Sequence, residues 1–179
     1  NLNSFKKIKK YPDLKTLAFW CRKNNIDRLK NHFQSSNYRF GLGLIFHITP
    51  SNIPINFAFS LIFGLLSGNS NIVKVPSNNY EQINIICSFL KKILKKKKYN
   101  LIKKMITVVK YKDYDEFTKK ISLMCDARII WGGDKTINDI KEFKTPTRSI
   151  DMTFADRYSI SVINSVKILN LNKKELDQL

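Results

Sequence analysis

The chain of 179 residues is long enough for one domain with a sizeable hydrophobic core, and its hydrophobic content of 43% excludes a disordered protein. The formal net charge of +18 is typical of a protein that binds nucleic acid or an anionic surface, but solvated lysines in a composition rich in Lys, Asn and Ile explain it as well, and we favour that explanation. Cys21, Cys87 and Cys125 lie far apart and form neither a disulfide framework nor a paired metal motif, so we expect a cytoplasmic protein without a metal site.

Much of the positive charge falls in one run, "KKILKKKKYNLIKK", at residues 91–104. Lysines at the end of an amphipathic helix also favour the negative helix C-terminus. The run contains no arginine and a single aromatic residue, which disfavours nucleic acid as the partner.

Apolar residues at helical spacing over residues 14–21 and 26–33 predict two short helices, or one helix broken at Asn24 and Asn25. We therefore divide the chain into an N-terminal helical segment, residues 1–40, and a second domain, residues 41–179. The basic start of the chain is followed by no apolar core of a signal peptide, and its first residue is not methionine, so we expect a piece of a longer protein.

From residue 41 onward, strand-like and helix-like stretches alternate. The strand-like stretches are "GLGLIFHI" (41–48), "NIVKVPS" (71–77), "MITVVKY" (105–111), "ARIIW" (127–131), "RSIDMTF" (148–154) and "YSISVIN" (158–164). This alternation predicts an α/β fold, a Rossmann-like parallel sheet with helices on both faces.

The apolar run at residues 53–66 is shorter than the ~20 residues of a membrane span. We expect it to form a buried helix, with Pro54 in its first turn and Gly68 as its C-terminal cap. No membrane span is therefore predicted.

Three polar turns follow predicted strands: "TPSN" (49–52), "KVPSNN" (74–79) and "WGGDKT" (131–136). Ligands of parallel sheets bind where the strands end, so these turns are the candidate site. In the first turn, Thr49, Ser51 and Asn52 precede a helix. An asparagine amide there can stabilise an oxyanion, but helix capping by Ser51 or Asn52 is an equally good explanation.

The other two turns contain residues suited to a nucleotide. Lys74 is placed to reach a ribose or a phosphate, and a solvated lysine is the alternative. No acidic residue follows it before Glu81, which leaves room for a 2′-phosphate. Gly132 and Gly133 permit close approach of the backbone to a phosphate, although the usual G-x-G-x-x-G fingerprint is absent.

Four motifs in order, "ITPSNIP", "GNSNIVKVPS", "RIIWGGDKTI" and "FADRYSISVI", resemble the aldehyde dehydrogenase superfamily, and within it the LuxC-type acyl-CoA reductases. These enzymes reduce activated fatty acyl groups to aldehydes with NADPH. The resemblance implies that Asn52 binds the oxyanion, that Thr49, Pro50 and Ser51 lie beside the nicotinamide, and that Lys74 contacts the adenosine ribose.

The same resemblance places Ser77 where NAD-preferring members carry glutamate, which fits NADPH. It places Gly133 and Asp134 where the family has the Gly-Ser that packs near the pyrophosphate, so the aspartate is a departure. Thr153 stands in place of the glutamate that activates water in hydrolytic relatives. None of the three cysteines matches the family's nucleophile.

The chain is thus expected to be the cofactor-binding part of an NADPH-dependent acyl-CoA reductase and to be inactive alone. The expected partners are acyl-CoA or another activated acyl donor and an acyl-transfer protein, with a homo-oligomer in the intact protein and no nucleic acid. A basic non-enzymatic module for nucleic acid or an acidic partner is the alternative. A hydrolytic aldehyde dehydrogenase is a third possibility, which Thr153 disfavours.

Overall fold

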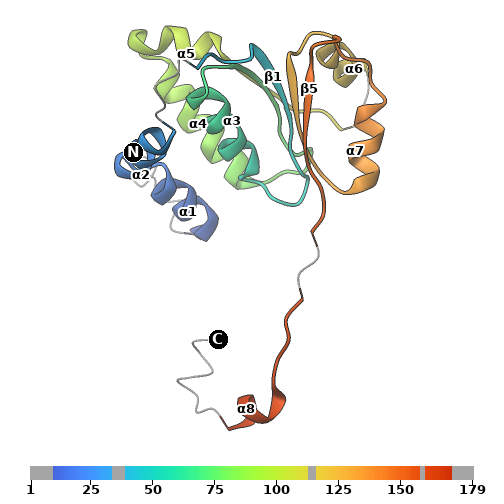
Figure 1. Ribbon diagram of the computed structural model, residues 1–179. Helices are drawn as coiled ribbons and strands as arrows, with labels where there is room; N and C mark the ends of the chain where they lie inside the picture. The colour runs from blue at the N-terminus through green and yellow to red at the C-terminus, as the bar shows by residue number, and fades with distance from the viewer. Residues whose placement is uncertain (1–9, 34–38, 113–115, 158–159, 171–179) are drawn as a thin grey trace.

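A computed structural model describes residues 10–33, 39–112, 116–157 and 160–170 (Figure 1). The strands are β1 (Leu44–Ile48), β2 (Ser70–Lys74), β3 (Ile106–Val109), β4 (Ala127–Trp131) and β5 (Ile150–Phe154). The helices are α1 (Pro12–Trp20), α2 (Lys23–His32), α3 (Asn56–Leu66), α4 (Glu81–Leu94), α5 (Asn100–Lys104), α6 (Glu116–Ser122), α7 (Asp134–Lys141) and α8 (Ser165–Leu169), with a 3-10 turn at Lys97–Tyr99.

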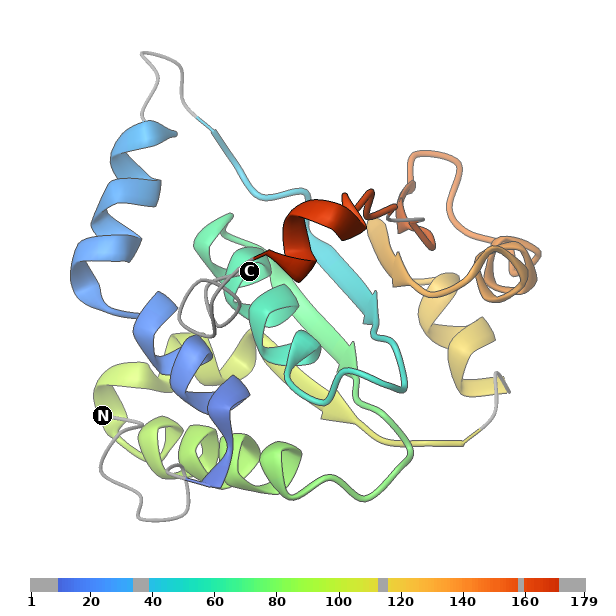
Figure 2. The ribbon, with the colours of Figure 1, turned by 90° about the horizontal axis from the view of Figure 1, so that it is seen from below.

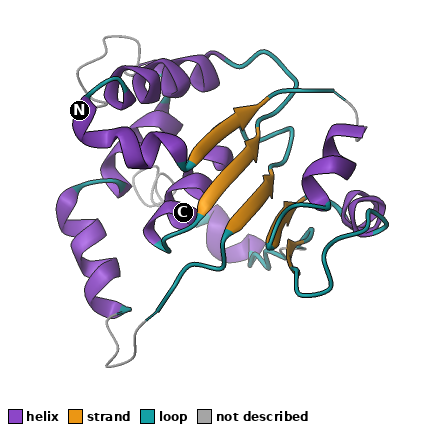
Figure 3. Ribbon diagram, turned by 90° about the horizontal axis from the view of Figure 1, so that it is seen from above, coloured by secondary structure: helices purple, strands orange, loops and turns teal. Residues whose placement is uncertain are grey.

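The five strands form one parallel sheet in the order β3-β2-β1-β4-β5. Helices α3 and α4 cover one face and helices α6 and α7 the other, so the sheet lies between two helical layers (Figures 1 and 3). The predicted fold class is confirmed. After β5 the chain leaves the sheet, and α8 lies away from it (Figure 1).

Two apolar clusters fill the space between the sheet and its helices. On the first face, α1 contributes Leu14 and Leu17 to the core formed with α3 and α4, and α1 lies beside α4 (Figure 2). The second cluster includes Ile121 of α6 and Ile140 of α7, packed on Ile130 of β4. The N-terminal helix α1 therefore shares a core with the sheet domain.

The predicted buried helix is α3, whose residues Phe57, Leu61 and Gly64 are buried. The helix ends at Leu66 and is capped as predicted by Gly68, which has a φ of +78°. The Gly68 and Asn69 amides donate to the Leu65 and Gly64 carbonyl oxygens at 3.0 Å, the pattern of a Schellman cap. Within the described ranges, no helix combines the length and apolarity that crossing a bilayer would need.

Three details differ from the sequence predictions. The break between the first two helices falls at Cys21 and Arg22, because the Lys23–His32 helix continues through the two asparagines. Pro54 lies in a turn before α3, which begins at Asn56. Of the predicted last strand, residues 158–159 lie outside the described residues, and residues 160–164 form no strand because they pair with no neighbour in the sheet.

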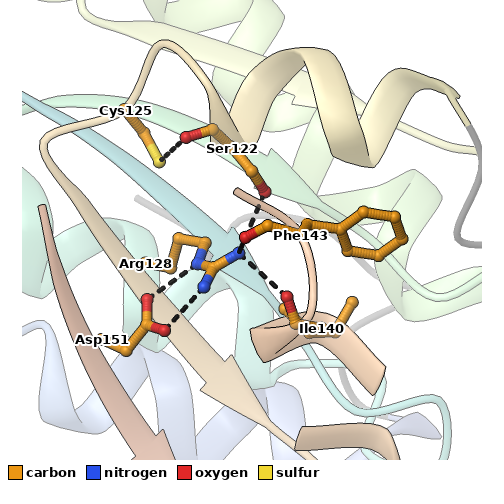
Figure 4. A network of polar contacts seen from close by, with 6 residues as sticks. All are labelled: Ser122, Cys125, Arg128, Ile140, Phe143 and Asp151. Carbon is orange, nitrogen blue, oxygen red and sulfur yellow. Dashed lines mark hydrogen bonds and ion pairs between the residues drawn. The ribbon is translucent and has the colours of Figure 1, made fainter. Parts of the chain in front are cut away.

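A buried arginine joins β4 to β5 and to two helices (Figure 4). Arg128 is 1% exposed, and its Nε and Nη2 donate to the two carboxylate oxygens of Asp151 at 2.7 and 2.6 Å. Its Nη1 donates to the hydroxyl of Ser122 at the end of α6, at 3.3 Å, and to the Ile140 and Phe143 carbonyl oxygens, at 2.9 and 3.1 Å. These last two acceptors are at the C-terminus of α7, where a cation is favoured.

A second buried polar network joins β1, β2 and α3. The Asn71 amide nitrogen donates to the Asn69 carbonyl oxygen at 2.6 Å, so the Asn71 Oδ1 faces His47 and accepts from its Nε2 at 2.9 Å. The His47 Nδ1 therefore accepts from the Ser60 hydroxyl, at 2.7 Å. Burial lowers the pKa of His47 to about 4, so the ring is neutral at pH 7.

Candidate functional site: a cleft at the carboxyl ends of the strands

A cleft of about 740 Å³ opens where the strands end. The chain turns from β1 to α3 on one face of the sheet and from β4 to α7 on the other, although β1 and β4 are neighbours. Such a divergence is where open parallel sheets bind their ligands. The lining consists of Thr49, Pro50, Ser51, Asn52, Ile53, Asn56, Lys74, Pro76, Ser77, Lys112, Trp131, Gly132, Gly133, Thr136, Phe154, Ala155, Asp156 and Arg157.

The predicted site residues come from three separate turns, and all but one of them line this cleft. Those that do are Thr49, Pro50, Ser51, Asn52, Lys74, Ser77, Gly132 and Gly133. The exception is Asp134, the first residue of α7, whose side chain is exposed and does not belong to the lining. The geometry therefore brings these residues together, and their roles stay predictions.

Two hydrogen bonds fix the turn after β1 to β2 and to the segment that follows β2. The Thr49 hydroxyl donates to the Lys74 carbonyl oxygen at 2.7 Å, which joins the ends of β1 and β2. The Tyr80 hydroxyl donates to the Ser51 carbonyl oxygen at 3.0 Å. These contacts hold the turn against the segment that follows β2.

The structure decides between the two explanations of the polar side chains in this turn. Helix α3 has Ile55 as its N-cap residue and no side-chain capping hydrogen bond. Capping by Ser51 or Asn52 is therefore wrong, because the helix begins further along the chain. Both side chains are exposed at the cleft, where the Asn52 amide can donate hydrogen bonds to a ligand.

Lys74 ends β2 and is only 7% exposed. Its Nζ lies 5.0 Å from the ring centroid of Tyr111, within the range of a cation–π interaction. The nearest acidic residue after the strand, Glu81, does not line the cleft, and its carboxylate accepts a hydrogen bond from the Tyr11 hydroxyl at 2.6 Å. Around Lys74 the cleft thus presents a cation.

The two glycines after β4 give room to side chains of the chain itself. A Cβ on Gly133 would lie 2.7 Å from a carboxylate oxygen of Asp156, and a Cβ on Gly132 would lie 3.0 Å from a methyl carbon of Thr136. Neither glycine has a positive φ. Any larger residue at Gly133 would displace Asp156 from its place at the start of α7.

Sequence reasoning missed the aromatic part of the lining. The rings of Trp131 and Phe154, paired on β4 and β5, stack with centroids 4.0 Å apart and planes 8° apart. The indole Nε1 of Trp131 is buried without a hydrogen-bond partner among the described residues. The available signal was that each aromatic residue ends a predicted strand.

Lys112, Asp156 and Arg157 were also not predicted as site residues. Asp156 and Arg157 stood in the quoted "FADR" motif, and Lys112 follows the third strand as Ser77 follows the second. A search for charged residues just beyond every strand, not only beyond those with polar turns, would have found them.

An apolar cavity of about 390 Å³ adjoins the cleft on the α3 side. It shares Ile53, Asn56, Trp131 and Phe154 with the cleft. Its other lining residues are Trp20, Ile55, Phe59, Ser60, Phe63 and Ile129.

As the structure describes them, none of the three cysteines lines the cleft. Burial raises the pKa of the Cys87 and Cys125 thiols, which makes them poorer nucleophiles. Thr153 on β5 is exposed and also lies outside the lining.

Comparison with known proteins gives the family. A model of the LuxC acyl-CoA reductases matches residues 14–177. No curated protein matches the chain.

Among solved structures, the fold is similar to that of a putative aldehyde dehydrogenase from Burkholderia cenocepacia, with 16% identity over 66% of this chain and 24% of that chain and a TM-score of 0.52. It is also similar to the glyceraldehyde-3-phosphate dehydrogenase GapN from Methanocaldococcus jannaschii, solved with NADP, with 18% identity over 79% of this chain and 31% of that chain and a TM-score of 0.52. A proline utilization A mutant from Bradyrhizobium japonicum is also similar in fold, with 16% identity over 64% of this chain and 12% of that chain and a TM-score of 0.51.

The chain thus spans less than a third of the length of each of these solved proteins, and the likeness to them shows the fold alone. The family match is of another kind, because it extends from α1 past β5 and includes the whole sheet and cleft. It confirms the resemblance found in the motifs: the chain belongs to the LuxC acyl-CoA reductase family.

Proposed function

We propose that this chain is the cofactor-binding part of an NADPH-dependent acyl-CoA reductase that forms aldehydes. The observation that carries the proposal is the convergence of three polar turns, which begin at residues 49, 74 and 131, on one cleft at the switch point of a parallel sheet. Family membership and the fold shared with aldehyde dehydrogenases support it. GapN, which has the same fold, was solved with NADP.

The residues present fit a dinucleotide with a 2′-phosphate better than one without. Selective binding of the unphosphorylated ribose uses a carboxylate that accepts from its 2′-hydroxyl. The carboxylate of Glu81 is bound to Tyr11 outside the cleft, whereas Lys74 and Ser77 line it. The Ser77 hydroxyl can donate to a phosphate, and the described lining places no carboxylate beside it to repel one.

The turn after β1 suits the reacting end of the cleft. When bound, NADPH supplies the hydride that reduces the acyl group. Asn52 stabilises the negative charge that develops on the carbonyl oxygen, because its exposed amide donates a hydrogen bond from a turn held by Thr49 and Tyr80. The nucleophile is a cysteine other than Cys21, Cys87 and Cys125.

The apolar cavity beside Asn52 suits the acyl group of the substrate. It is lined almost entirely by apolar side chains and meets the cleft at Ile53 and the Trp131–Phe154 pair. Burying apolar chain there releases it from water, with about 25 cal/mol gained per Å². Acyl-CoA or another activated acyl donor, delivered by an acyl-transfer protein, is the proposed substrate.

Two measurements test the proposal. NADPH is titrated into the chain and followed by quenching of tryptophan fluorescence, because Trp131 lines the cleft. Saturable binding that is weakened by Lys74→Gln supports the proposal, and absence of binding contradicts it. Aldehyde formation from acyl-CoA and NADPH is then assayed. Turnover by this chain alone would contradict the assignment of the nucleophile to a cysteine outside the three it carries.

A basic binding module remains the second candidate, because the lysines of residues 95–98 are exposed together with Lys103 and Lys104. This surface precedes β3, at the amino ends of the strands and therefore opposite the cleft. Titration of a generic oligonucleotide at two salt concentrations separates the candidates. Salt-steep oligonucleotide binding without NADPH binding favours the module.

A further inference from the structure

One end of the cleft lies between the segments that follow β2 and β3. The two strands are parallel neighbours, and Lys74 pairs with Val109 at their ends. Three residues beyond each of these positions come Ser77 and Lys112, and both line the cleft. The register of the sheet therefore brings Lys112 to the same end of the cleft as Lys74 and Ser77.

Within the described lining, the charged side chains at this end of the cleft are those of Lys74 and Lys112. The only carboxylate in the described lining is that of Asp156, which follows β5 at the opposite edge of the sheet. Residues 82–112 contain no Asp or Glu, Asp113 and Asp115 lie outside the described residues, and Glu81 is held by Tyr11. An anion at this end meets two lysines and no competing carboxylate from the described part of the lining.

The two lysines are held differently. Lys74 is nearly buried, with its ammonium over the ring of Tyr111, whereas Lys112 is exposed at the rim. In the proposed function Lys74 contacts the adenosine ribose, which NADPH and NADH share. An exposed lysine with a flexible stem adds attraction only for a ligand that brings further negative charge to the rim.

We propose that Lys112 binds the 2′-phosphate of the cofactor and that it sets the preference for NADPH over NADH. The inference rests on the proposed function and names a residue that the motifs do not. A phosphate monoester carries a charge of about −1.5 to −2 at neutral pH and accepts hydrogen bonds on three oxygens. Ser77 donates one of these bonds, and the Lys112 ammonium supplies the charge.

The experiment compares dissociation constants of the chain and its variants for NADPH and NADH. The same variants are titrated with 2′,5′-ADP and 5′-AMP, which differ only in the 2′-phosphate and need no nicotinamide site. The variants are Lys112→Gln, Lys112→Arg and the matched control Lys110→Gln. Lys110 lies two residues earlier, donates to Asn79 at 2.7 Å and is not part of the lining.

Lys112→Gln is expected to raise the Kd for NADPH and for 2′,5′-ADP roughly 10-fold, which is about 1.4 kcal/mol. The Kd values for NADH and 5′-AMP stay within about 2-fold, because those ligands bring no charge to the rim. Lys112→Arg retains the preference, and Lys110→Gln binds as the unmodified chain does. Each variant is checked for an unchanged thermal midpoint, expected because Lys112 is exposed.

The outcomes separate this inference from the proposed function. If the chain prefers NADPH and Lys112→Gln keeps that preference, the inference is overturned and the proposed function stands. Equal binding of NADPH and NADH by the unmodified chain overturns the inference and the 2′-phosphate argument, but not cofactor binding. Failure to bind any of the four nucleotides overturns both.

Discussion

Replacement of Arg128 by methionine tests whether the buried network between β4 and β5 holds the fold together. The substitution keeps a long apolar stem but removes a guanidinium that is 1% exposed. Asp151 loses both donors, and the carbonyl oxygens of Ile140 and Phe143 lose theirs at the end of α7 (Figure 4).

The expected loss of stability depends on the polar groups that Arg128→Met leaves without a hydrogen-bond partner. Breaking a buried ion pair by removing one partner typically costs about 3–5 kcal/mol, because the other charge stays without compensation. The Asp151 side chain is 23% exposed and regains some water, which lowers the cost. The orphaned carbonyl oxygens raise it again, by about 1 kcal/mol or more each where water cannot reach them. We expect a loss of about 4 kcal/mol in the free energy of unfolding.

Urea unfolding followed by circular dichroism at 222 nm measures this loss. The matched control is Arg148→Met, because Arg148 also pairs with an aspartate, Asp126 at 3.2 Å, but its side chain is 85% exposed. The control should lose less than about 1 kcal/mol. The double variant Arg128→Met with Asp151→Leu should recover about 2 kcal/mol relative to Arg128→Met, because no charge is left uncompensated. If Arg128→Met behaves like the control, or if the double variant is additive, the ion pair does not stabilise the fold.

Three further predictions concern β1, α3 and the cleft. Gly64→Ala should destabilise the chain by about 3 kcal/mol in urea unfolding, because the new methyl group meets the Asn71 Oδ1 that accepts from His47. The pKa of His47 is about 4 in the fold against 6.5 for the free group, so the unfolded chain binds more protons between these values and stability decreases as the pH is lowered. The free energy of unfolding should drop by about 2 kcal/mol from His47 between pH 7 and pH 5, and comparison with His47→Gln isolates that part. If the proposed function holds, Asn52→Ala in a reductase that contains this chain should lower kcat roughly 100- to 1,000-fold while the Kd for NADPH is unchanged; equal kcat would contradict the oxyanion role.

The sheet could be predicted because its strands are short, apolar and separated by clear turn residues. All five strands of the structure were expected within a few residues, and so was the cap at Gly68. The start of α3 was misplaced because Pro54 is suited both to a first helical turn and to the tight turn it occupies. The sixth strand was expected from the β-branched residues of 158–164. Strand propensity alone does not indicate whether a neighbouring strand is available for pairing.

The candidate site was predictable only in part, for a related reason. Polar turns after strands are visible in sequence, which is how Asn52, Lys74 and Gly133 were found. Contacts between distant segments are not visible, because nothing in a single sequence pairs Tyr11 with Glu81 or Trp131 with Phe154. From the sequence, capping and ligand binding were equally good explanations of Ser51 and Asn52. Only the first residue of α3 in the structure decides between them.

The two buried networks support different halves of the cleft. His47 lies two residues before Thr49 on the path from β1 into the cleft, and Arg128 lies three residues before Trp131 on β4.

Each network pairs its strand with the neighbour that lines the same half: β2 through Asn71 for the first, and β5 through Asp151 for the second. The Asn71–His47 network therefore fixes the end with Lys74, proposed for the adenosine ribose. The Arg128–Asp151 network fixes the stacked aromatic rings at the other end. It follows that a partly destabilising change at Arg128, such as Arg128→Lys, should disturb the near-ultraviolet circular dichroism signal of Trp131. Binding of 2′,5′-ADP should stay intact. Loss of both together would show that the two halves of the cleft are not independent.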